Sequence, residues 1–264
     1  MSKENLFLKA DNYKAAISAN RPLNKDELKQ LDSYFKIDLT YSSNALEGNT
    51  LTLSETKILL EDGLTVSGKP MKDYLEAEGH SKAYDYLLSI AHNDDLIISE
   101  EITRKLHYFF YSGIDAEKAG KYRDIQVYIT GTEYLPPRVD DVPGLMSEMI
   151  IRIDKVLNTM HPIEAAALAH KWLVDIHPFL DGNGRTARLL MNLILINKGY
   201  GVASIPPVLR NEYIESLRLS QKPKGADNNP FINLIAECVL EAQKDMCRLL
   251  NIDTKTYAYK EVTQ

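Results

Sequence analysis

The stretch HPFLDGNGRTARLLMN, residues 177–192, joins a polar, glycine-containing turn directly to an apolar helix. The preceding segment PIEAAALAHKWLVDI, residues 162–176, has helical periodicity, and Leu189, Leu190, Leu193 and Ile194 form one apolar side of the following helix. The glycines between the two helices let backbone N–H groups converge, and the second helix contributes its positive N-terminal end. The turn therefore predicts a concave anion site that suits phosphate.

The side chains of this turn agree with a phosphate site. Arg185 and Arg188 are three residues apart and share one helix face near the N-terminus, where two guanidinium groups suit several phosphate groups. Asp181 supplies a hard oxygen ligand beside them, which is the way proteins commonly hold Mg²⁺. His177 stands at the entrance of the turn and has the ordinary pKa of a general base near neutral pH.

Other phosphate-binding motifs fit the chain less well. The sequence contains no GxxxxGK[ST] motif. Gly182, Gly184 and Ala187 match the spacing of a dinucleotide-binding fingerprint, but that fingerprint requires a preceding strand and an acidic residue about 20 positions later. Here a helix precedes the glycines and the next acidic residue is Glu212. We therefore exclude a dinucleotide-binding fold.

Helical periodicity extends over most of the chain. Asn24 with Glu27 predicts a capped helix start before the apolar positions of residues 24–39, and Ser54 and Gly63 predict the ends of a short helix. Further helices are expected at residues 70–91, 99–111, 141–158, 162–176, 184–198, 210–219 and 230–250. No linker rich in Pro, Gly or Ser divides the core, so we expect an N-terminal helical region, 1–50, followed by one compact unit, 51–264.

The segment RDIQVYITGTEYLPP, residues 123–137, departs from the helical pattern. Ile125, Val127 and Ile129 alternate with polar residues before a turn at Gly131, and two prolines end the segment. The pattern predicts a short β-hairpin that must lean on the helices, because a lone hairpin is marginally stable in water.

Composition excludes several classes of protein. The 264 residues are 44% hydrophobic and 26% charged with a net charge of −6, and no basic face for nucleic acid is evident. No apolar run reaches the length of a membrane span, and the N-terminal MSKENLFLKADNYK alternates polar with apolar residues, unlike a signal peptide. We therefore expect a cytoplasmic protein that binds neither nucleic acid nor membrane. Cys238 and Cys247 fall on opposite faces of one helix, and His170 is expected in the core.

The turn resembles the signature of the Fic family, HPFx[DE]GNGRxxR, which it matches at every defined position from His177 to Arg188. The likeness extends over about residues 50–250 and implies an all-α fold with a short β-hairpin flap. Most Fic proteins transfer AMP from ATP to a Ser, Thr or Tyr hydroxyl of a protein. The resemblance therefore implies an Mg²⁺-dependent protein adenylyltransferase with ATP as co-substrate. Relatives that phosphorylate carry ANK where this chain has GNG.

The resemblance also implies roles for individual residues. His177 would deprotonate the target hydroxyl, and Asp181 would hold Mg²⁺. Arg185 would bind the β-phosphate, Arg188 the γ-phosphate, and Tyr213 would pack against the adenine. The remaining motif positions would cradle the α- and β-phosphates: Gly182, Asn183 and Gly184. The hairpin around Val127–Tyr134 would pair with an extended segment of the target protein.

A second motif lies upstream. SSNALEGN, residues 42–49, matches the family's inhibitory pattern [ST]xxxE[GN] at Ser43, Glu47 and Gly48. In relatives with this element the glutamate pairs with the second motif arginine, here Arg188, and displaces the γ-phosphate. The likeness therefore implies that Glu47 inhibits the enzyme.

Three alternatives remain open at the level of the sequence. The enzyme could remove AMP from a modified protein, since some relatives use the inhibitory glutamate to orient a water, or it could transfer another nucleotide. A catalytically silent module that only senses nucleotide is the third alternative, although a pure binder has no need of His177. The resemblance also allows a homodimer.

Overall fold

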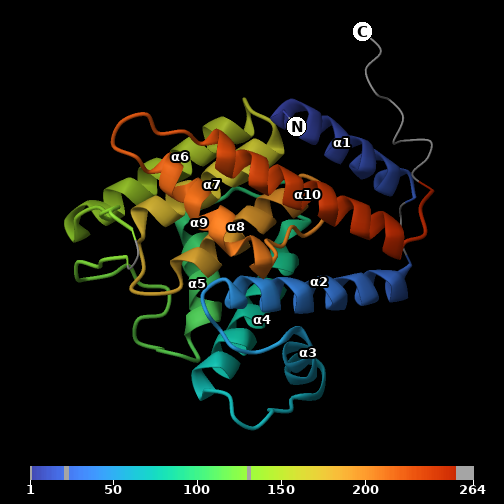
Figure 1. Ribbon diagram of the computed structural model, residues 1–264, viewed down its shortest axis with the longest axis horizontal. Coiled ribbons are helices and arrows are strands. Elements are labelled where there is room, and N and C mark those ends of the chain that lie inside the picture. Colours follow the sequence, from blue (N-terminus) through green and yellow to red (C-terminus); the bar gives the residue numbers. More distant parts are fainter. Residues whose placement is uncertain (1, 21–23, 130–131, 254–264) are drawn as a thin grey trace.

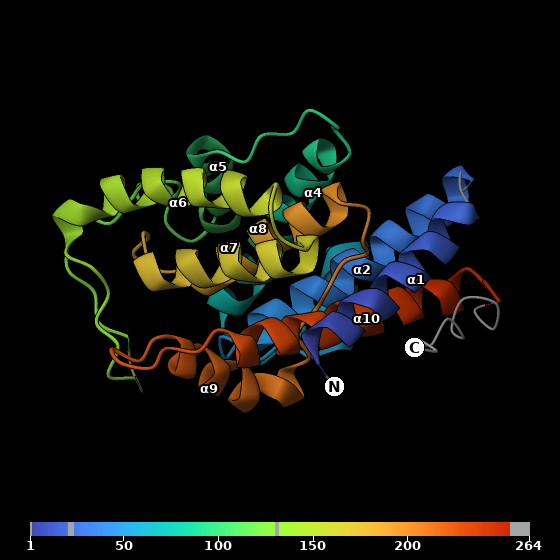
Figure 2. The same ribbon diagram turned by 90° about the horizontal axis from the view of Figure 1, so that it is seen from above.

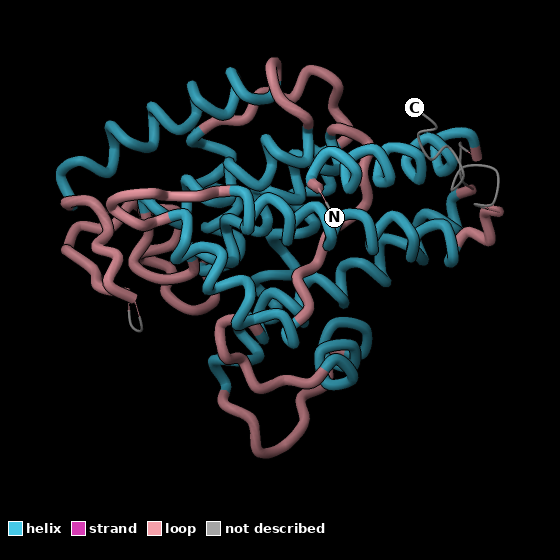
Figure 3. The backbone as a smooth tube through the Cα atoms, turned by 45° about the horizontal axis from the view of Figure 1, so that its top comes forward, coloured by secondary structure: helices cyan, strands magenta, loops and turns pink. Residues whose placement is uncertain are grey.

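The computed structural model describes residues 2–20, 24–129 and 132–253, and it builds them from helices and loops without a strand (Figures 1 and 3). The helices are α1 Lys3–Ala19, α2 Lys25–Ala45, α3 Leu53–Asp62, α4 Met71–Ala91, α5 Glu100–Tyr111, α6 Val142–Leu157, α7 Pro162–Ile176, α8 Asn183–Asn197, α9 Arg210–Ser220 and α10 Asn229–Leu249, with 3₁₀ turns η1 Val139–Asp141 and η2 Pro207–Leu209. The all-α prediction is confirmed for the described residues. None of these helices is both long and apolar enough to cross a bilayer.

Helix α8 lies at the centre of the fold, between α7, α4 and α5, and α2 also contacts it (Figure 1). Its side chains from Arg185 to Ile196 are all buried, which agrees with a sequence that is apolar on nearly every side after the motif. Because the core holds α8 on all sides, the N-terminal end of this helix has a fixed position. That end carries the turn predicted to bind phosphate.

Helix α1 lies within the N-terminal region, 1–50, that was expected to be helical, but its bounds were not predicted. It lies side by side with α10 in both views (Figures 1 and 2), and it buries Leu6, Phe7, Ala10 and Ile17. These residues recur at helical spacing, but polar residues interrupt the pattern and the local sequence reads as an alternation. The contact with α10, more than 200 positions away in the chain, decides the helical state.

The helix boundaries show which capping signals were correct. Asn24 caps α2 through a capping box with Glu27, as predicted. The prediction that α3 starts at Ser54 is wrong, because Thr52 accepts the Glu55 N–H and Glu55 in turn accepts the Thr52 N–H. The three-residue spacing from Thr52 to a glutamate is the capping-box signal. Gly63 ends α3 with a φ of 67°, as predicted.

The predicted β-hairpin is not borne out in the described part of residues 123–137. Residues 124–129 and 132–137 form two arms without a strand, and the turn predicted at Gly131 lies outside the described residues. Side chains join the arms instead: Gln126 Nε2 donates to the Pro136 carbonyl, and Arg123 donates to the carbonyls of Ile125 and Pro137. The arms have no third strand to pair with, and two strands alone are marginal.

Candidate active site

His177 ends helix α7 in the left-handed conformation, with a φ of 51° that few residues other than glycine adopt. Its backbone N–H still donates to the Leu173 carbonyl, so the turn of chain begins at the histidine itself. The ring Nδ1 lies 3.3 Å from the Val174 carbonyl. A carbonyl only accepts hydrogen bonds, so Nδ1 carries the proton and Nε2 is the basic nitrogen.

Burial lowers the pKa of His177 below its ordinary value, and the Val174 carbonyl offsets this effect only in part. The neutral imidazole is therefore the favoured form near pH 7. A neutral ring with Nε2 as acceptor has the protonation state that a general base requires.

The turn after His177 is held in place by its own side chains. Asn183 spans it, because its amide accepts from the Phe179 N–H and donates to the Phe179 carbonyl, both at 2.9 Å. Gly182 has a φ of 78°, and a Cβ there would lie 2.6 Å from the Phe110 ring. The Phe179 ring stacks on His107 with centroids 3.8 Å apart. The side chain of Asn183 therefore shapes the turn, while the first backbone N–H groups of α8 point out of the helix end without intrahelical acceptors.

Arg188 is 1% exposed and is surrounded by acceptors. Its Nε donates to the Ser43 hydroxyl at 2.9 Å, and Nη2 donates to the Ser43 carbonyl at 2.8 Å. Nη2 also donates to Glu47 Oε1 at 2.7 Å, and Nη1 donates to the Tyr213 hydroxyl at 3.2 Å. A buried guanidinium requires such a set of partners, because an unpaired buried charge costs several kcal/mol. The structure thus brings together both parts of the upstream motif and the second motif arginine.

Glu47 follows directly after α2 and lies over the N-terminal end of α8. A Cβ added at Gly184 would lie only 2.3 Å from Glu47 Oε1, so the carboxylate occupies the space that the glycine leaves open. Burial raises the pKa of Glu47, but the charges of Arg188 and Arg185 outweigh it and hold that pKa below its ordinary value. The carboxylate is therefore ionised near pH 7 and sits where the sequence predicts bound phosphate.

Arg185 is held by a residue that the sequence analysis did not identify. Its Nη1 lies 2.8 Å from Glu76 Oε1 on helix α4, and its guanidinium packs over the Phe110 ring at 4.5 Å. Both charged side chains are almost fully buried, at 4% and 6% exposed. Glu76 is one carboxylate among several in an ordinary helical sequence, so no local signal marks it. The binding of a β-phosphate by Arg185 stays a prediction.

Asp181 is the half-exposed carboxylate of the turn. Its Oδ1 accepts from the Gly182 N–H at 2.6 Å and lies 3.4 Å from Arg185 Nη2, while Oδ2 lies 3.8 Å from Lys72 Nζ. No cluster of three or more His, Cys, Asp or Glu side chains in the described residues could hold a metal by itself. A single accessible carboxylate fits Mg²⁺ that takes most of its ligands from nucleotide phosphates and water.

Tyr213 is buried beside Arg188, so only part of its side chain is accessible to a ligand. Its hydroxyl lies 3.2 Å from Arg188 Nη1 and 3.2 Å from His170 Nε2. Burial, followed by the charge of Arg188, lowers the pKa of His170 well below its ordinary value. His170 is therefore a neutral core histidine, as predicted, and it orients the hydroxyl that contacts Arg188.

Four of these residues line one cavity. It has a volume of about 230 Å³, and His177, Glu47, Gly184 and Tyr213 line it together with residues of α9. Ile129 and Thr132, from the two arms of the segment predicted to be a hairpin, lie on its border. A basic nitrogen, a helix N-terminus and an extended segment thus face one space.

Arg123 links that segment to His177, and no motif in the sequence pointed to this arginine. Its side chain is 4% exposed, and its Nε donates to the His177 carbonyl at 2.9 Å. The other guanidinium nitrogens donate to Ile125 and Pro137, one in each arm. Its backbone N–H donates to the Pro178 carbonyl at 2.8 Å. Arg123 therefore fixes the arms relative to the strained backbone of His177.

Comparison with protein families places this geometry in context. Residues 97–195, which include α7, the turn and most of α8, match the sequence model of the Fic/DOC family. Curated relatives include the protein adenylyltransferase Fic of Drosophila erecta, 36% identical over 89% of this chain, and that of Drosophila yakuba, 38% identical over 75% of it. The chain spans 46% of the length of the first relative and 39% of the second.

Solved structures share the fold. A Fic domain containing signaling protein from Bacteroides thetaiotaomicron superposes with a TM-score of 0.83 and 28% identity, over 92% of this chain and 98% of that one. Fic-1 from C. elegans superposes with a TM-score of 0.80 and 28% identity, over 94% of this chain and 73% of that one. The similarity therefore includes the helices on both sides of the matched region.

Proposed function

Because residues 97–195 form a Fic/DOC family domain, we propose that this protein is an Mg²⁺-dependent adenylyltransferase that transfers AMP from ATP to a Ser, Thr or Tyr hydroxyl of a target protein. The observation that carries the proposal is that His177 and Gly184, which lies at the N-terminal end of α8, line the same cavity. A general base thus stands beside a site with converging backbone N–H groups. The curated relatives named as adenylyltransferases support the same reaction.

In the proposed reaction, His177 Nε2 accepts the proton of the target hydroxyl. The hydroxyl oxygen forms a bond to the α-phosphorus of ATP, and the bond from that phosphorus to the bridging oxygen of the β-phosphate breaks. Pyrophosphate leaves, and AMP stays attached to the target. The N–H groups at Asn183 and Gly184 would stabilise the negative charge that develops on the phosphate oxygens, and that of Gly182 would join them once released from Asp181. Asp181 would hold Mg²⁺, which when bound supplies positive charge to the departing phosphates.

The arms on either side of residues 130–131 are the proposed docking site for the target. Ile125, Tyr128 and Leu135 are exposed there, and Tyr128 keeps 76% of its surface accessible. An extended target segment could pair with the backbone around Val127–Tyr134 and bury these side chains. Backbone pairing selects little for sequence, so the hydroxyl that reaches His177 would define the modified residue.

Glu47 is proposed to inhibit this reaction. Its carboxylate holds Arg188 and lies over Gly184, so the γ-phosphate of ATP and Glu47 would compete for one guanidinium group and one space. ATP bound while Glu47 stays in place would be misaligned for attack. Ser43 supports the inhibitory arrangement, because its hydroxyl and carbonyl both accept from Arg188.

The test is a labelling experiment with a matched inactive control. Purified wild type, Glu47→Gly and the double variant Glu47→Gly/His177→Ala are incubated with Mg²⁺-ATP and a lysate, and modified proteins are identified by mass spectrometry. The proposal expects peptides whose mass is increased by one adenylyl group with Glu47→Gly and none above background with the double variant. Labelling with another nucleotide, or loss of AMP from a previously modified protein, would favour the alternative transferase or the reverse reaction. No labelling by any variant would favour a nucleotide-sensing module.

A further inference from the structure

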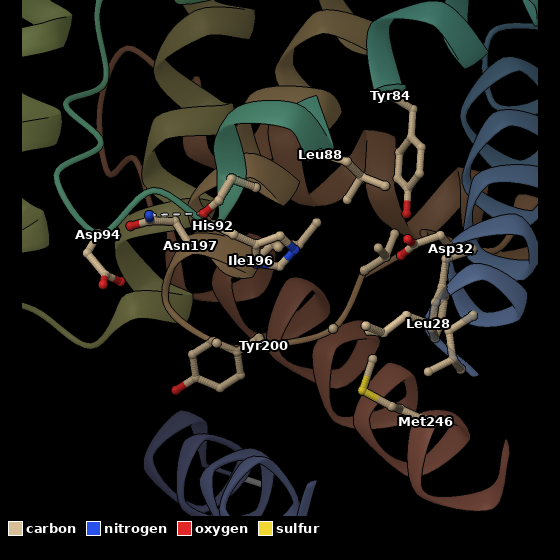
Figure 4. Close-up of a pocket in the computed structure, with 16 residues that line it drawn as sticks. Leu28, Asp32, Tyr84, Leu88, His92, Asp94, Ile196, Asn197, Tyr200 and Met246 are labelled. Atoms are coloured by element: carbon tan, nitrogen blue, oxygen red, sulfur yellow. Dashed lines mark hydrogen bonds between the residues drawn. The ribbon is translucent and has the colours of Figure 1, made fainter. Parts of the chain in front are cut away.

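A second cavity lies between α2, α4, the loop after α8 and α10, and it shares no lining residue with the candidate active site (Figure 4). Its volume is about 210 Å³, which corresponds to roughly seven water molecules at ~30 Å³ each. Polar and apolar atoms contribute almost equally to its wall, and the apolar part comes from side chains such as Leu31, Phe35, Leu88 and Met246. A small ligand with an apolar body would fit this space.

Two polar side chains of this cavity, Tyr84 and Asp32, lie together on one side of it (Figure 4). The Tyr84 side chain is 1% exposed and points into the cavity toward Asp32 (Figure 4). Within residues 2–20, 24–129 and 132–253, neither the Tyr84 hydroxyl nor the Asp32 carboxylate has a hydrogen-bond partner. His92, at the end of α4, is exposed and lines the same space. A buried tyrosine normally satisfies its hydroxyl, so the Tyr84 hydroxyl is available to a polar ligand in the cavity.

The charge of the lining selects the kind of ligand. Two of the lining residues, Asp32 and Asp94, are acidic, and none is Lys or Arg. Burial raises the pKa of Asp32, and burial followed by the charge of Asp32 raises the pKa of Tyr84. A cation beside the two groups would lower both pKa values, because it stabilises the ionised forms of the carboxylate and the hydroxyl.

We propose that this cavity binds a small molecule with a primary ammonium group and an apolar body. The ammonium has three N–H donors. The cavity offers two acceptors beside one another, the Asp32 carboxylate and the Tyr84 hydroxyl oxygen. The apolar body packs on Phe35, Leu88 and Met246, while the ammonium group meets Asp32 and Tyr84, since ligand sites commonly combine an apolar surface with a few polar groups that fix orientation.

The experiment uses the full chain and phenethylamine as the probe, followed by two-dimensional NMR of ¹⁵N-labelled protein near pH 7. We expect saturable shifts at the amides of Gly199 and Gly201, which line the cavity, with a Kd on the order of 1 mM for a ligand of about nine non-hydrogen atoms. The neutral analogue 2-phenylethanol should bind at least about tenfold more weakly, since it lacks the charge that pairs with Asp32.

Variants separate specific binding from general charge effects. Asp32→Asn should weaken phenethylamine at least about tenfold, and Tyr84→Phe should weaken it a few-fold through loss of one acceptor. Asp26→Asn is the matched control, because it removes the same charge from an exposed position of α2 outside the cavity. Equal affinity of wild type and Asp32→Asn, shifts confined to other regions, or no shift up to about 10 mM probe would each overturn the proposal.

Discussion

Replacement of Glu47 by glycine should release AMP transfer, and the structure supplies the expected magnitude. The variant removes the 2.7 Å contact between Glu47 and Arg188 and empties the space above Gly184. The Glu47 side chain keeps 36% of its surface exposed, so the full energy of a buried ion pair does not apply. A hydrogen bond between charged groups contributes about 1.5–3 kcal/mol, and ~2 kcal/mol corresponds to about a 30-fold change in the competent population.

The assay is incorporation of radiolabelled AMP by purified protein, including self-modification, at saturating ATP. Glu47→Asp, whose side chain is shorter by one methylene, should release activity only partly. Arg188→Ala should not mimic Glu47→Gly, because it removes the γ-phosphate partner together with the inhibitory contact. Equal labelling by wild type and Glu47→Gly would refute the inhibitory role of Glu47, while leaving the assignment of His177 untouched.

Four further predictions concern the same site. His177→Ala should lower transfer by roughly 10²–10⁴-fold while ATP affinity, measured by calorimetry, stays nearly unchanged; normal transfer would exclude the general base. Since burial lowers the pKa of His177, kcat/KM of Glu47→Gly should rise with pH around a midpoint below the ordinary ~6.5, and a midpoint above that value would contradict the neutral base. Asp181→Asn should reduce Mg²⁺-supported transfer without a change in melting temperature, and unchanged activity in excess chelator would refute the metal role. Arg123→Lys, which cannot reach three carbonyls at once, should lower kcat for a protein target with ATP affinity preserved, whereas parallel loss of both would indicate a general folding defect.

The sequence by itself was sufficient to predict most helices of the core and to locate the turn that is proposed to bind phosphate. Helix boundaries from α4 to α10 agree with the expected ranges within one residue, because the apolar periodicity there is strong and glycines, prolines and capping residues mark the ends. The motif from His177 to Arg188 is contiguous, so the geometry of one helix end already places its residues together. Asn24 and Gly63 were identified for the same local reason.

Tertiary structure decided the features that depend on distant parts of the chain. Glu76 pairs with Arg185 across 109 positions of sequence, and Arg123 reaches His177 across 54. Periodicity gives no information about such partners, since an acidic or basic residue on a helix or loop is ordinarily solvated. The same limitation explains why no bounds were predicted for α1 within the expected helical region, 1–50, because this helix is stabilised by packing against α10.

In the arms around residues 130–131, by contrast, the sequence pattern predicted strands that the described residues do not form. Alternation of Ile125, Val127 and Ile129 predicts a strand, yet a strand requires a partner backbone, and in the described residues side chains of Arg123 and Gln126 join the arms instead. The sequence thus determined which residues could form the site, because local spacing controls helices, caps and turns. Only the fold determined which charges neutralise one another, because a buried arginine pairs with the carboxylate that the packing of the helices places beside it.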